Sequence, residues 1–172
     1  RAEKVGVDYE ANNYEGYGVG GVAVVVETLT DNKNRTVADV RHLFDKYGAG
    51  LGASGCVSWQ FDKKGVIIME SEGLDEDAVM MQALDAGAED FLVEEGVFEI
   101  YTAPDDFSTV REALEKEGYT FAQAELQMVP QNYITLEKEE DMAQMRKLLD
   151  NLEDNDDVQK VYTNCSIDLF EE

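Results

Sequence analysis

Residues 65–102, GVIIMESEGLDEDAVMMQALDAGAEDFLVEEGVFEIYT, contain the patterns of three strands and one helix in close succession. The apolar run Val66–Met69 is typical of a buried strand, and Asp75 and Gly87 are residue types that commonly cap the two ends of a helix. The sequence Glu94-Glu95-Gly96 then predicts a tight turn between two short strands. A strand, a helix and a hairpin in this order are the first four elements of a split β-α-β unit.

The residues that follow complete this unit. Pro104-Asp105-Asp106 begins a second predicted helix, which ends at Gly118, and residues 119–129 form the last predicted strand. The region 65–129 therefore has the β-α-β-β-α-β order of a ferredoxin-like domain.

The residues on either side of this region predict a second domain of the same kind. A strand, a helix and a strand are expected before it, and the same three elements after it: 20–30, 34–47, 56–61, 133–136, a helix that includes 142–152, and 158–167. Together they form another β-α-β-β-α-β order whose central hairpin is opened. We therefore predict an α+β fold of two ferredoxin-like domains, one inserted into the central hairpin of the other.

Acidic residues are concentrated in the middle of the chain. The whole chain has 38 acidic and 14 basic side chains, for a formal net charge of −24, but residues 69–129 hold 17 acidic and 2 basic ones while residues 1–68 hold 9 and 8. Because a shift in composition often marks a domain boundary, we predict an inserted acidic domain at 69–129, a discontinuous domain formed by 14–68 with 130–172, and a tail or domain remnant at 1–13. A strongly negative chain disfavours nucleic acid as a partner, whereas the nearly neutral first 68 residues leave room for one.

A glycine-rich segment precedes the first predicted strand. Gly16, Gly18 and Gly21 have the G-x-G-x-x-G spacing of dinucleotide-binding loops, but they lead into a strand rather than a helix, so we interpret the segment as a flexible or tightly turned loop. Its two tyrosines could stack on a base or a partner, or pack their rings on the edge of the core. The residues of this loop that we expect to contact a partner are Tyr14, Tyr17, Gly18, Gly20 and Gly21.

Basic residues rival acidic ones only around the first predicted helix. Lys33 and Arg35 lie in the segment 30–36 that joins the first predicted strand to this helix, where the free N–H groups of a helix N-terminus can receive a phosphate. Asn34 is also a natural N-cap, so a purely structural turn would explain the asparagines but not the cations. The predicted nucleic-acid contacts are Lys33, Asn34, Arg35, Arg41 and Lys46.

The sequence contains no catalytic constellation that we can identify. His42, the single histidine, lies on the polar face of a predicted helix without a Ser or Cys nucleophile nearby, and the acidic pairs lie at turns and helix starts. Cys56 and Cys165 lack the CxxC spacing of metal and redox sites and are expected to be buried thiols. We therefore expect no enzyme, no catalytic residue, no metal and no cofactor, and the apolar runs are too short to span a membrane.

Three segments near the start of the chain form one recognisable pattern: YEGYGVGGVAV at 14–24, ETLTDNKNRT at 27–36, and Val40-Arg41-His42. They closely resemble the signature of the YebC family, and Gly52, Gly55, Val57-Ser58-Trp59, Phe61 and Lys64-Gly65 resemble the next strand of that family. The chain departs from the family at Val19, where the family usually has proline, and we expect it to lack the family's basic, largely helical N-terminal domain. The resemblance covers the chain from about Tyr14 to its C-terminus.

The resemblance implies a cytoplasmic bacterial regulator of gene expression that binds DNA, or a mitochondrial relative that activates translation of a cytochrome oxidase subunit. Other members look like ribosome-associated factors that relieve stalling at proline-rich stretches. The family fold has three domains, of which the nested pair would be the second and third, with no known cofactor or catalytic residue. The expected partners are therefore DNA, or ribosomal RNA and ribosomal proteins, with no membrane and no small-molecule substrate. A third alternative, a ferredoxin-like module that binds a small molecule, requires only the fold.

Overall fold

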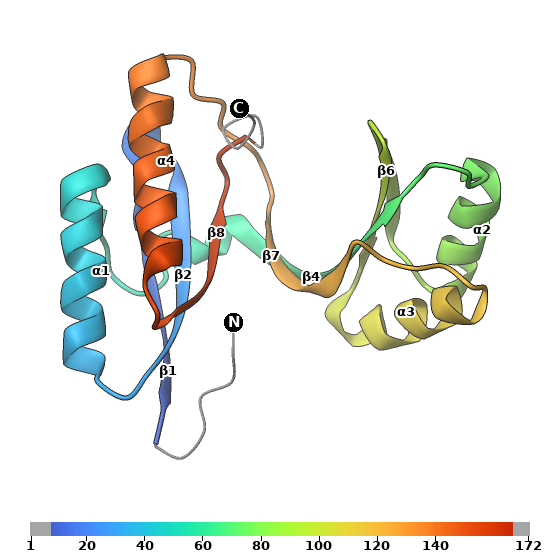
Figure 1. Cartoon of the computed structure of the whole chain (residues 1–172), viewed down its shortest axis with the longest axis horizontal. Helices are drawn as coiled ribbons and strands as arrows, with labels where there is room; N and C mark the ends of the chain where they lie inside the picture. The colour runs from blue at the N-terminus through green and yellow to red at the C-terminus, as the bar shows by residue number, and fades with distance from the viewer. Residues whose placement is uncertain (1–7, 167–172) are drawn as a thin grey trace. The chain divides into compact units, whose positions relative to one another are not determined.

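The computed structural model describes residues 8–166 and divides the chain into two compact units. Unit 1 consists of the residues up to Phe61 together with those from Pro130 onward, and unit 2 is Asp62–Val129. Each unit has a four-stranded antiparallel sheet and two α-helices (Figure 1). The predicted α+β fold with two ferredoxin-like domains, one inserted into the other, is confirmed.

Unit 2 has the β-α-β-β-α-β order expected from the sequence, and its strands lie in the sheet order β5-β6-β4-β7. Local signals place its elements: Asp75 caps its first helix by accepting a hydrogen bond from the Asp77 N–H at 3.1 Å, and Gly87 ends it. Glu94 pairs directly with Val97 across a two-residue turn. The elements are β4 (Phe61–Glu70), α2 (Glu76–Ala86), β5 (Asp90–Glu94), β6 (Val97–Thr102), α3 (Phe107–Lys116) and β7 (Gln123–Pro130).

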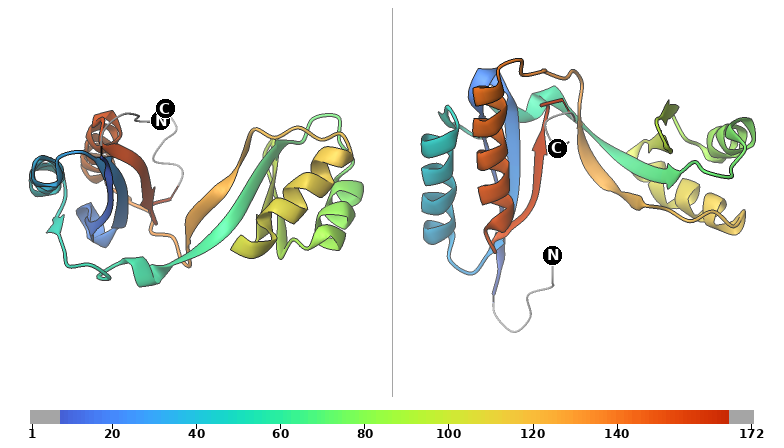
Figure 2. Two further views of the ribbon diagram at one scale, coloured as in Figure 1. Left: turned by 90° about the horizontal axis from the view of Figure 1, so that it is seen from below. Right: turned by 45° about the horizontal axis from the view of Figure 1, so that its top comes forward.

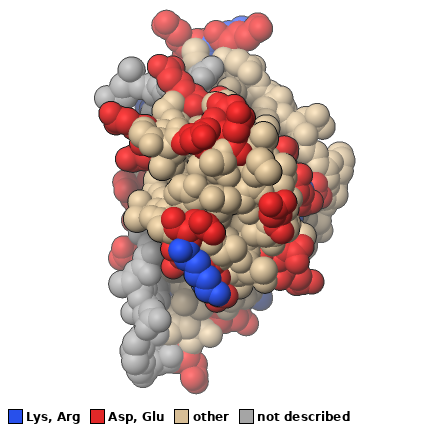
Figure 3. Space-filling model, turned by 90° about the vertical axis from the view of Figure 1, so that its right-hand side faces the viewer, with Lys and Arg blue, Asp and Glu red and all other residues tan. Residues whose placement is uncertain are grey.

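Both helices of unit 2 cover the same face of its sheet (Figure 2). The core between the sheet and the helices consists of fully buried side chains, among them Ile67, Met69 and Ile100 from the strands and Val79 and Leu114 from the helices. The surface of this unit that faces the viewer in Figure 3 carries many acidic side chains and few basic ones, which agrees with the composition of residues 69–129. The acidic residues are therefore solvated around an ordinary apolar core.

Unit 1 has the sheet order β3-β1-β2-β8, and its two helices pack side by side on one face of the sheet (Figures 1 and 2). Its core joins Val24 and Val26 of the second strand to Phe44 of the first helix and Met145 and Leu148 of the last helix. The elements are β1 (Glu10–Tyr17), β2 (Ala23–Thr30), α1 (Lys33–Tyr47), β3 (Gly50–Leu51), α4 (Glu139–Asp154) and β8 (Val158–Thr163).

The first strand of unit 1 differs from the prediction. Residues 10–13 belong to β1 rather than to a tail, and the rest of the predicted tail, 1–7, lies outside the described residues. β1 pairs with β2 along its whole length, from Glu10 opposite Thr30 to Tyr17 opposite Ala23. Backbone pairing with an apolar neighbour therefore holds a strand whose own sequence is polar.

Two predicted strands of unit 1 are wrong. Residues 56–60 form a turn and one 3₁₀ turn, Ser58–Gln60, and the strand begins only at Phe61, from where β4 continues to Glu70. The predicted strand 133–136 is absent, since Ile134 makes only an isolated parallel bridge to Cys165. In the first case the backbone N–H groups are bonded to a side chain instead of to a neighbouring strand.

Candidate nucleic-acid interface

Arg35 is held by two carboxylates at the start of α1. Its Nη2 donates to Asp31 Oδ1 at 3.1 Å and to Asp157 Oδ2 at 2.9 Å, and the Thr36 hydroxyl donates to the same Asp157 oxygen at 2.8 Å. The Asp157 side chain is only 8% exposed. The hydrogen bond to Asp157, followed by that to Asp31, raises the pKa of Arg35 above its ordinary value. Arg35 therefore joins α1 to the residue before β8, which is a structural role independent of any partner.

The N-cap of α1 is Asn32 and not Asn34. The Asn32 side-chain oxygen accepts a hydrogen bond from the Arg35 N–H at 3.1 Å, and its backbone oxygen accepts from the Thr36 N–H at 3.1 Å. The helix accordingly begins at Lys33, one residue before the predicted start. Lys33 and Asn34 are exposed in the first turn, so the expectation that Asn34 caps the helix is wrong.

The four predicted cations share α1 but do not form one compact patch. At 100° and 1.5 Å per residue, Lys33 and Arg41 are about 80° and about 12 Å apart, whereas Arg41 and Lys46 point about 140° apart. Lys46 lies with its Nζ 5.1 Å from the centre of the Tyr47 ring. Both Arg41 and Lys46 are exposed. Lys33 and Arg41 are thus the two cations on this helix that can reach a common partner without disturbing a carboxylate pair.

The first two glycines of the glycine-rich segment are explained by close packing. A Cβ on Gly16 would lie 2.6 Å from the Gly50 carbonyl oxygen and 2.8 Å from the Phe44 ring. A Cβ on Gly18 would lie 2.5 Å from the sulfur of Met145. These positions bring β1 against β3 and the helices.

The next two glycines of this segment are explained by the turn from β1 to β2. Gly20 and Gly21 have φ of +70° and +79°, in the left-handed region that favours glycine. The turn is short: Val19–Gly21 form a 3₁₀ turn, and β2 follows at once. The segment is therefore a hairpin connection, and its glycines are accounted for without a ligand.

The two tyrosines of this segment have different environments. Tyr14 is half-buried against the core, its hydroxyl has no hydrogen-bond partner within residues 8–166, and burial, with a smaller effect of Glu10, raises its pKa. Tyr17 is 37% exposed, and its hydroxyl donates to the Cys56 carbonyl oxygen at 3.4 Å. Tyr17 is therefore the tyrosine available to a partner.

Glu15, which is not among the predicted site residues, organises the loop that precedes β4. Its carboxylate accepts hydrogen bonds from the backbone N–H groups of Gly55, Val57 and Ser58 at 2.7, 3.1 and 2.7 Å, although it is only 6% exposed. Burial alone would raise the pKa of Glu15, but these donors together with the Ser58 side chain hold that pKa below its ordinary value. The sequence feature that could have indicated this role is the position of Glu15 directly before the uncharged residues 16–26.

Trp59 is the most exposed large hydrophobic side chain among residues 8–166, at 67%. Its Nε1 donates to the Cys56 carbonyl oxygen at 3.0 Å, so Trp59 and Tyr17 share one acceptor. The backbone oxygen of Trp59 in turn accepts from the Gln131 side chain at 3.1 Å. An exposed tryptophan held in this way is a candidate contact that the sequence prediction does not include.

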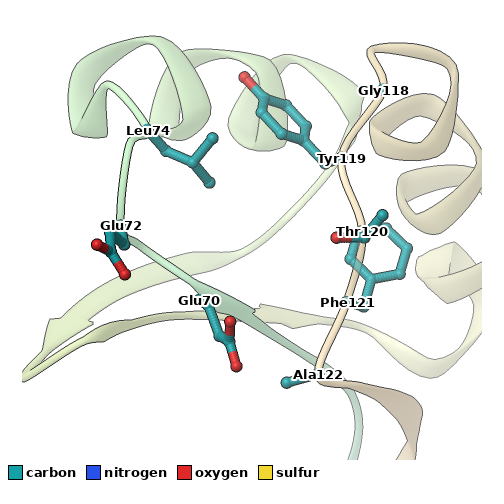
Figure 4. Close-up of a pocket in the computed structure, with 8 residues that line it drawn as sticks. All are labelled: Glu70, Glu72, Leu74, Gly118, Tyr119, Thr120, Phe121 and Ala122. Carbon is teal, nitrogen blue, oxygen red and sulfur yellow. The ribbon is translucent and has the colours of Figure 1, made fainter.

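Unit 2 contains a surface groove with a volume of about 460 Å³ (Figure 4). The end of β4 and the loop after it form one side, and the segment between α3 and β7 forms the other. None of the predicted site residues lines it. The lining residues are Glu70, Glu72, Leu74, Gly118, Tyr119, Thr120, Phe121 and Ala122.

Within residues 8–166, no three His, Cys, Asp or Glu side chains are grouped so that they could hold a metal ion. Cys165 is a buried free thiol and Cys56 a partly buried one, and burial is the main cause that raises the pKa of both. No helix in the described part of the chain is both long and apolar enough to cross a membrane.

Comparison with known proteins identifies the family. A family model described as the second and third domain of TACO1/YebC matches residues 9–165. The chain is 58% identical over 161 residues to a probable transcriptional regulatory protein from Caldicellulosiruptor bescii, covering 93% of this chain and 66% of the relative. It is 61% identical over 158 residues to one from Acetivibrio thermocellus, covering 91% and 65%. The chain thus spans about two thirds of the length of these relatives.

A solved structure agrees with the sequence relatives. The crystal structure of a conserved hypothetical protein from Aquifex aeolicus matches with a TM-score of 0.83 and 43% identity, covering 95% of this chain and 68% of that chain. The family model covers β1 through the end of β8, including the strand that the sequence prediction omits. The chain therefore belongs to the TACO1/YebC family, of which it carries the second and third domains.

Proposed function

We propose that this chain is part of a regulator of gene expression and that unit 1 contacts DNA. The observation that carries the proposal is the identity of 58% and 61% to proteins named probable transcriptional regulatory proteins, over more than nine tenths of the chain. Such close relatives share a fold, and we infer that they share the class of partner. No catalytic group is assigned, in keeping with a regulator that acts by binding.

The exposed cations of α1 support a phosphate contact in unit 1. Lys33 and Arg41 are exposed, and within the described residues neither forms an ion pair. Lys33 also lies in the first turn of a 15-residue helix, where unpaired N–H groups favour an anion. Each phosphate that a cation neutralises releases counterions, so binding through these residues depends on salt.

A mobility shift with duplex DNA at several salt concentrations tests this proposal. We expect the affinity to fall with salt, and the slope of log affinity against log salt to decrease by about one for each of Lys33→Gln and Arg41→Gln. Lys116→Gln, on the exposed end of α3 in unit 2, is the matched control and should leave the slope unchanged. Absence of a shift at low salt, or an equal loss in all three variants, would refute DNA binding by unit 1.

A ribosome-associated translation factor is the second candidate, supported by the acidic surface of unit 2 in Figure 3. An acidic surface suits basic ribosomal proteins, because complementary charge increases the rate and specificity of association. We expect the chain to cosediment with ribosomes, and neutralisation of the exposed pairs Glu94-Glu95 and Asp105-Asp106 to reduce its recovery. Neutralisation of Asp39 and Asp45 on α1 is the control. Recovery in the ribosome-free fraction would count against this candidate.

A further inference from the structure

Three segments of unit 1 carry no charged side chain: residues 16–26, 47–61 and 130–136. They stand out because 30% of the chain is charged and its net charge is −24. The nearest charged residues in the sequence are Glu15 and Glu27 around the first segment, Lys46 and Asp62 around the second, and Glu125 and Glu137 around the third. The side chain of Glu15 is buried and bonded to three backbone N–H groups, so its charge is compensated inside the protein.

Hydrogen bonds join these segments into one part of unit 1. The Ala49 N–H donates to the Tyr17 carbonyl at 2.9 Å, which links the first segment to the second. The Gln131 N–H donates to the Gln60 carbonyl at 2.9 Å, which links the second segment to the third. A surface built from them has neither carboxylates nor cations of its own. Within these segments a polyanion meets no carboxylate, and the exposed Asp62 directly follows the second segment.

Two aromatic side chains project from this uncharged surface. Trp59 and Tyr17 are 67% and 37% exposed, and both donate to the Cys56 carbonyl oxygen, so the two side chains are anchored at the same point of the backbone. The loop that carries Cys56 is anchored on either side of it, because the Glu15 carboxylate holds Gly55 and Val57. The rings are therefore presented with little freedom to lose when a flat partner stacks on them.

We propose that Trp59 and Tyr17 form a stacking platform for unpaired bases of single-stranded nucleic acid. Every base has a face that can stack on an aromatic ring, so stacking of this kind tolerates any base sequence. A duplex keeps its bases paired and buried, so the platform distinguishes unpaired from paired segments. The inference rests on the proposed function only in that the partner is a nucleic acid, and it names the unpaired base as the part recognised.

Trp59 is the only tryptophan of the chain, so its fluorescence reports directly on the platform. The test is a titration of the whole chain with oligo(dT) and oligo(U), followed by Trp59 quenching and by the anisotropy of a dye-labelled oligonucleotide. We expect quenching that saturates together with the anisotropy change. Trp59→Ala should weaken binding about 5- to 150-fold, and Trp59→Phe less, because a smaller ring is retained.

Three controls separate stacking from other effects. Tyr17→Phe keeps the ring and loses only the hydroxyl bond, so its affinity should stay within about twofold, whereas Tyr17→Ala should weaken binding severalfold. Met81→Ala, on an exposed side chain of unit 2, should change nothing. Far-ultraviolet circular dichroism and melting confirm that each variant is folded.

Two further outcomes would overturn the inference, and they differ in what they say about the proposed function. If oligonucleotides or duplex DNA bind while Trp59 is not quenched and Trp59→Ala binds as tightly as the parent chain, the platform is refuted and the nucleic-acid proposal survives. If neither single-stranded nor duplex nucleic acid binds at low salt, both the platform and the proposed function fail.

Discussion

The buried carboxylate of Glu15 accepts a hydrogen bond from the backbone N–H of Ser58 at 2.7 Å, although the two residues are 43 positions apart in the chain. The bond connects the middle of β1 to the loop that replaces a predicted strand. Because the same carboxylate also accepts from Gly55 and Val57, a single side chain satisfies three backbone donors that would otherwise require water or a neighbouring strand. The shape of this loop, and with it the position of Trp59, depends on one ionised residue.

Replacement of Glu15 by Gln should therefore destabilise unit 1, by about 1–3 kcal/mol. An amide keeps one acceptor oxygen but places an NH₂ group against backbone donors. The denaturant midpoint of unit 1, followed through Trp59 fluorescence, measures the effect. Glu10→Gln on the exposed start of the same strand should cost less than about 0.5 kcal/mol. Equal midpoints for the two variants would contradict the role given to Glu15.

The same carboxylate should make the stability of unit 1 sensitive to acid. The pKa of Glu15 is lowered in the folded chain, so its contribution is fully present above the ordinary pKa of a glutamate and is lost as the pH falls from there through the lowered value. We expect the unfolding midpoint to fall less steeply over this range in Glu15→Gln than in the parent chain. If the unfolding midpoints of Glu15→Gln and of the parent chain fell equally with pH, the ionisation of Glu15 would not contribute to stability.

Removal of Asp157 should destabilise unit 1 more than removal of Asp31, although both pair with Arg35. Asp157 is buried and also accepts from the Thr36 hydroxyl at 2.8 Å, so Asp157→Ala leaves that hydroxyl only its longer bond of 3.2 Å to the Asn32 carbonyl oxygen and should cost about 1–3 kcal/mol. Asp31 is half exposed, and Asp31→Ala should cost less than about 1 kcal/mol. Chemical denaturation of both variants gives the comparison. For the same reason, Arg35→Glu is a poor test of nucleic-acid binding. That substitution sets a carboxylate against Asp157, so a loss of binding could come from destabilisation and would not show that Arg35 contacts the nucleic acid.

Two glycines that look alike in the sequence should respond differently to asparagine. A Cβ at Gly16 meets a backbone oxygen and a buried ring at under 3 Å, so Gly16→Ala requires β1 to move and should cost about 1–3 kcal/mol. At Gly21 nothing lies within 4 Å, and only the positive φ opposes a side chain. Gly21→Ala should therefore cost about 1–2 kcal/mol, and Gly21→Asn less, because Asn tolerates the left-handed region. Thermal melting distinguishes the cases: Gly16→Asn should be at least as harmful as Gly16→Ala.

Unit 2 could be predicted in detail because its signals are local. Asp75 caps the helix that it precedes, Gly87 ends it, and Glu95-Gly96 form the turn of the hairpin to which they belong. Each of these residues acts within a few positions of itself, so a reading of the sequence in short windows recovers the order of the elements.

Unit 1 could be predicted only in outline because its decisive contacts are distant in sequence. The polar start of β1 forms a strand because it pairs with β2, with Glu10 opposite Thr30. The loop before β4 does not form a strand, because its backbone N–H groups donate to the Glu15 carboxylate. The candidate site shows the same limit. Arg35 has the sequence pattern of an exposed phosphate ligand, while the carboxylate that holds it, Asp157, lies 122 positions away. Trp59 carries no pattern that distinguishes an exposed ring from a core residue.

The start of α1 offers a last test, in which two neighbouring asparagines should behave differently. Asn32 accepts the Arg35 N–H through its side chain, so Asn32→Ala leaves that donor unpaired and should lower the stability of unit 1 by about 1 kcal/mol. Asn34 lies within the first turn, exposed, where alanine has the higher helix propensity, so Asn34→Ala should leave stability unchanged or slightly increase it. Denaturation followed through Trp59 measures both. If Asn34→Ala proved the more harmful, the helix would begin at the residue expected from the sequence, and the cap that positions Lys33 and Arg35 would have to be reassigned.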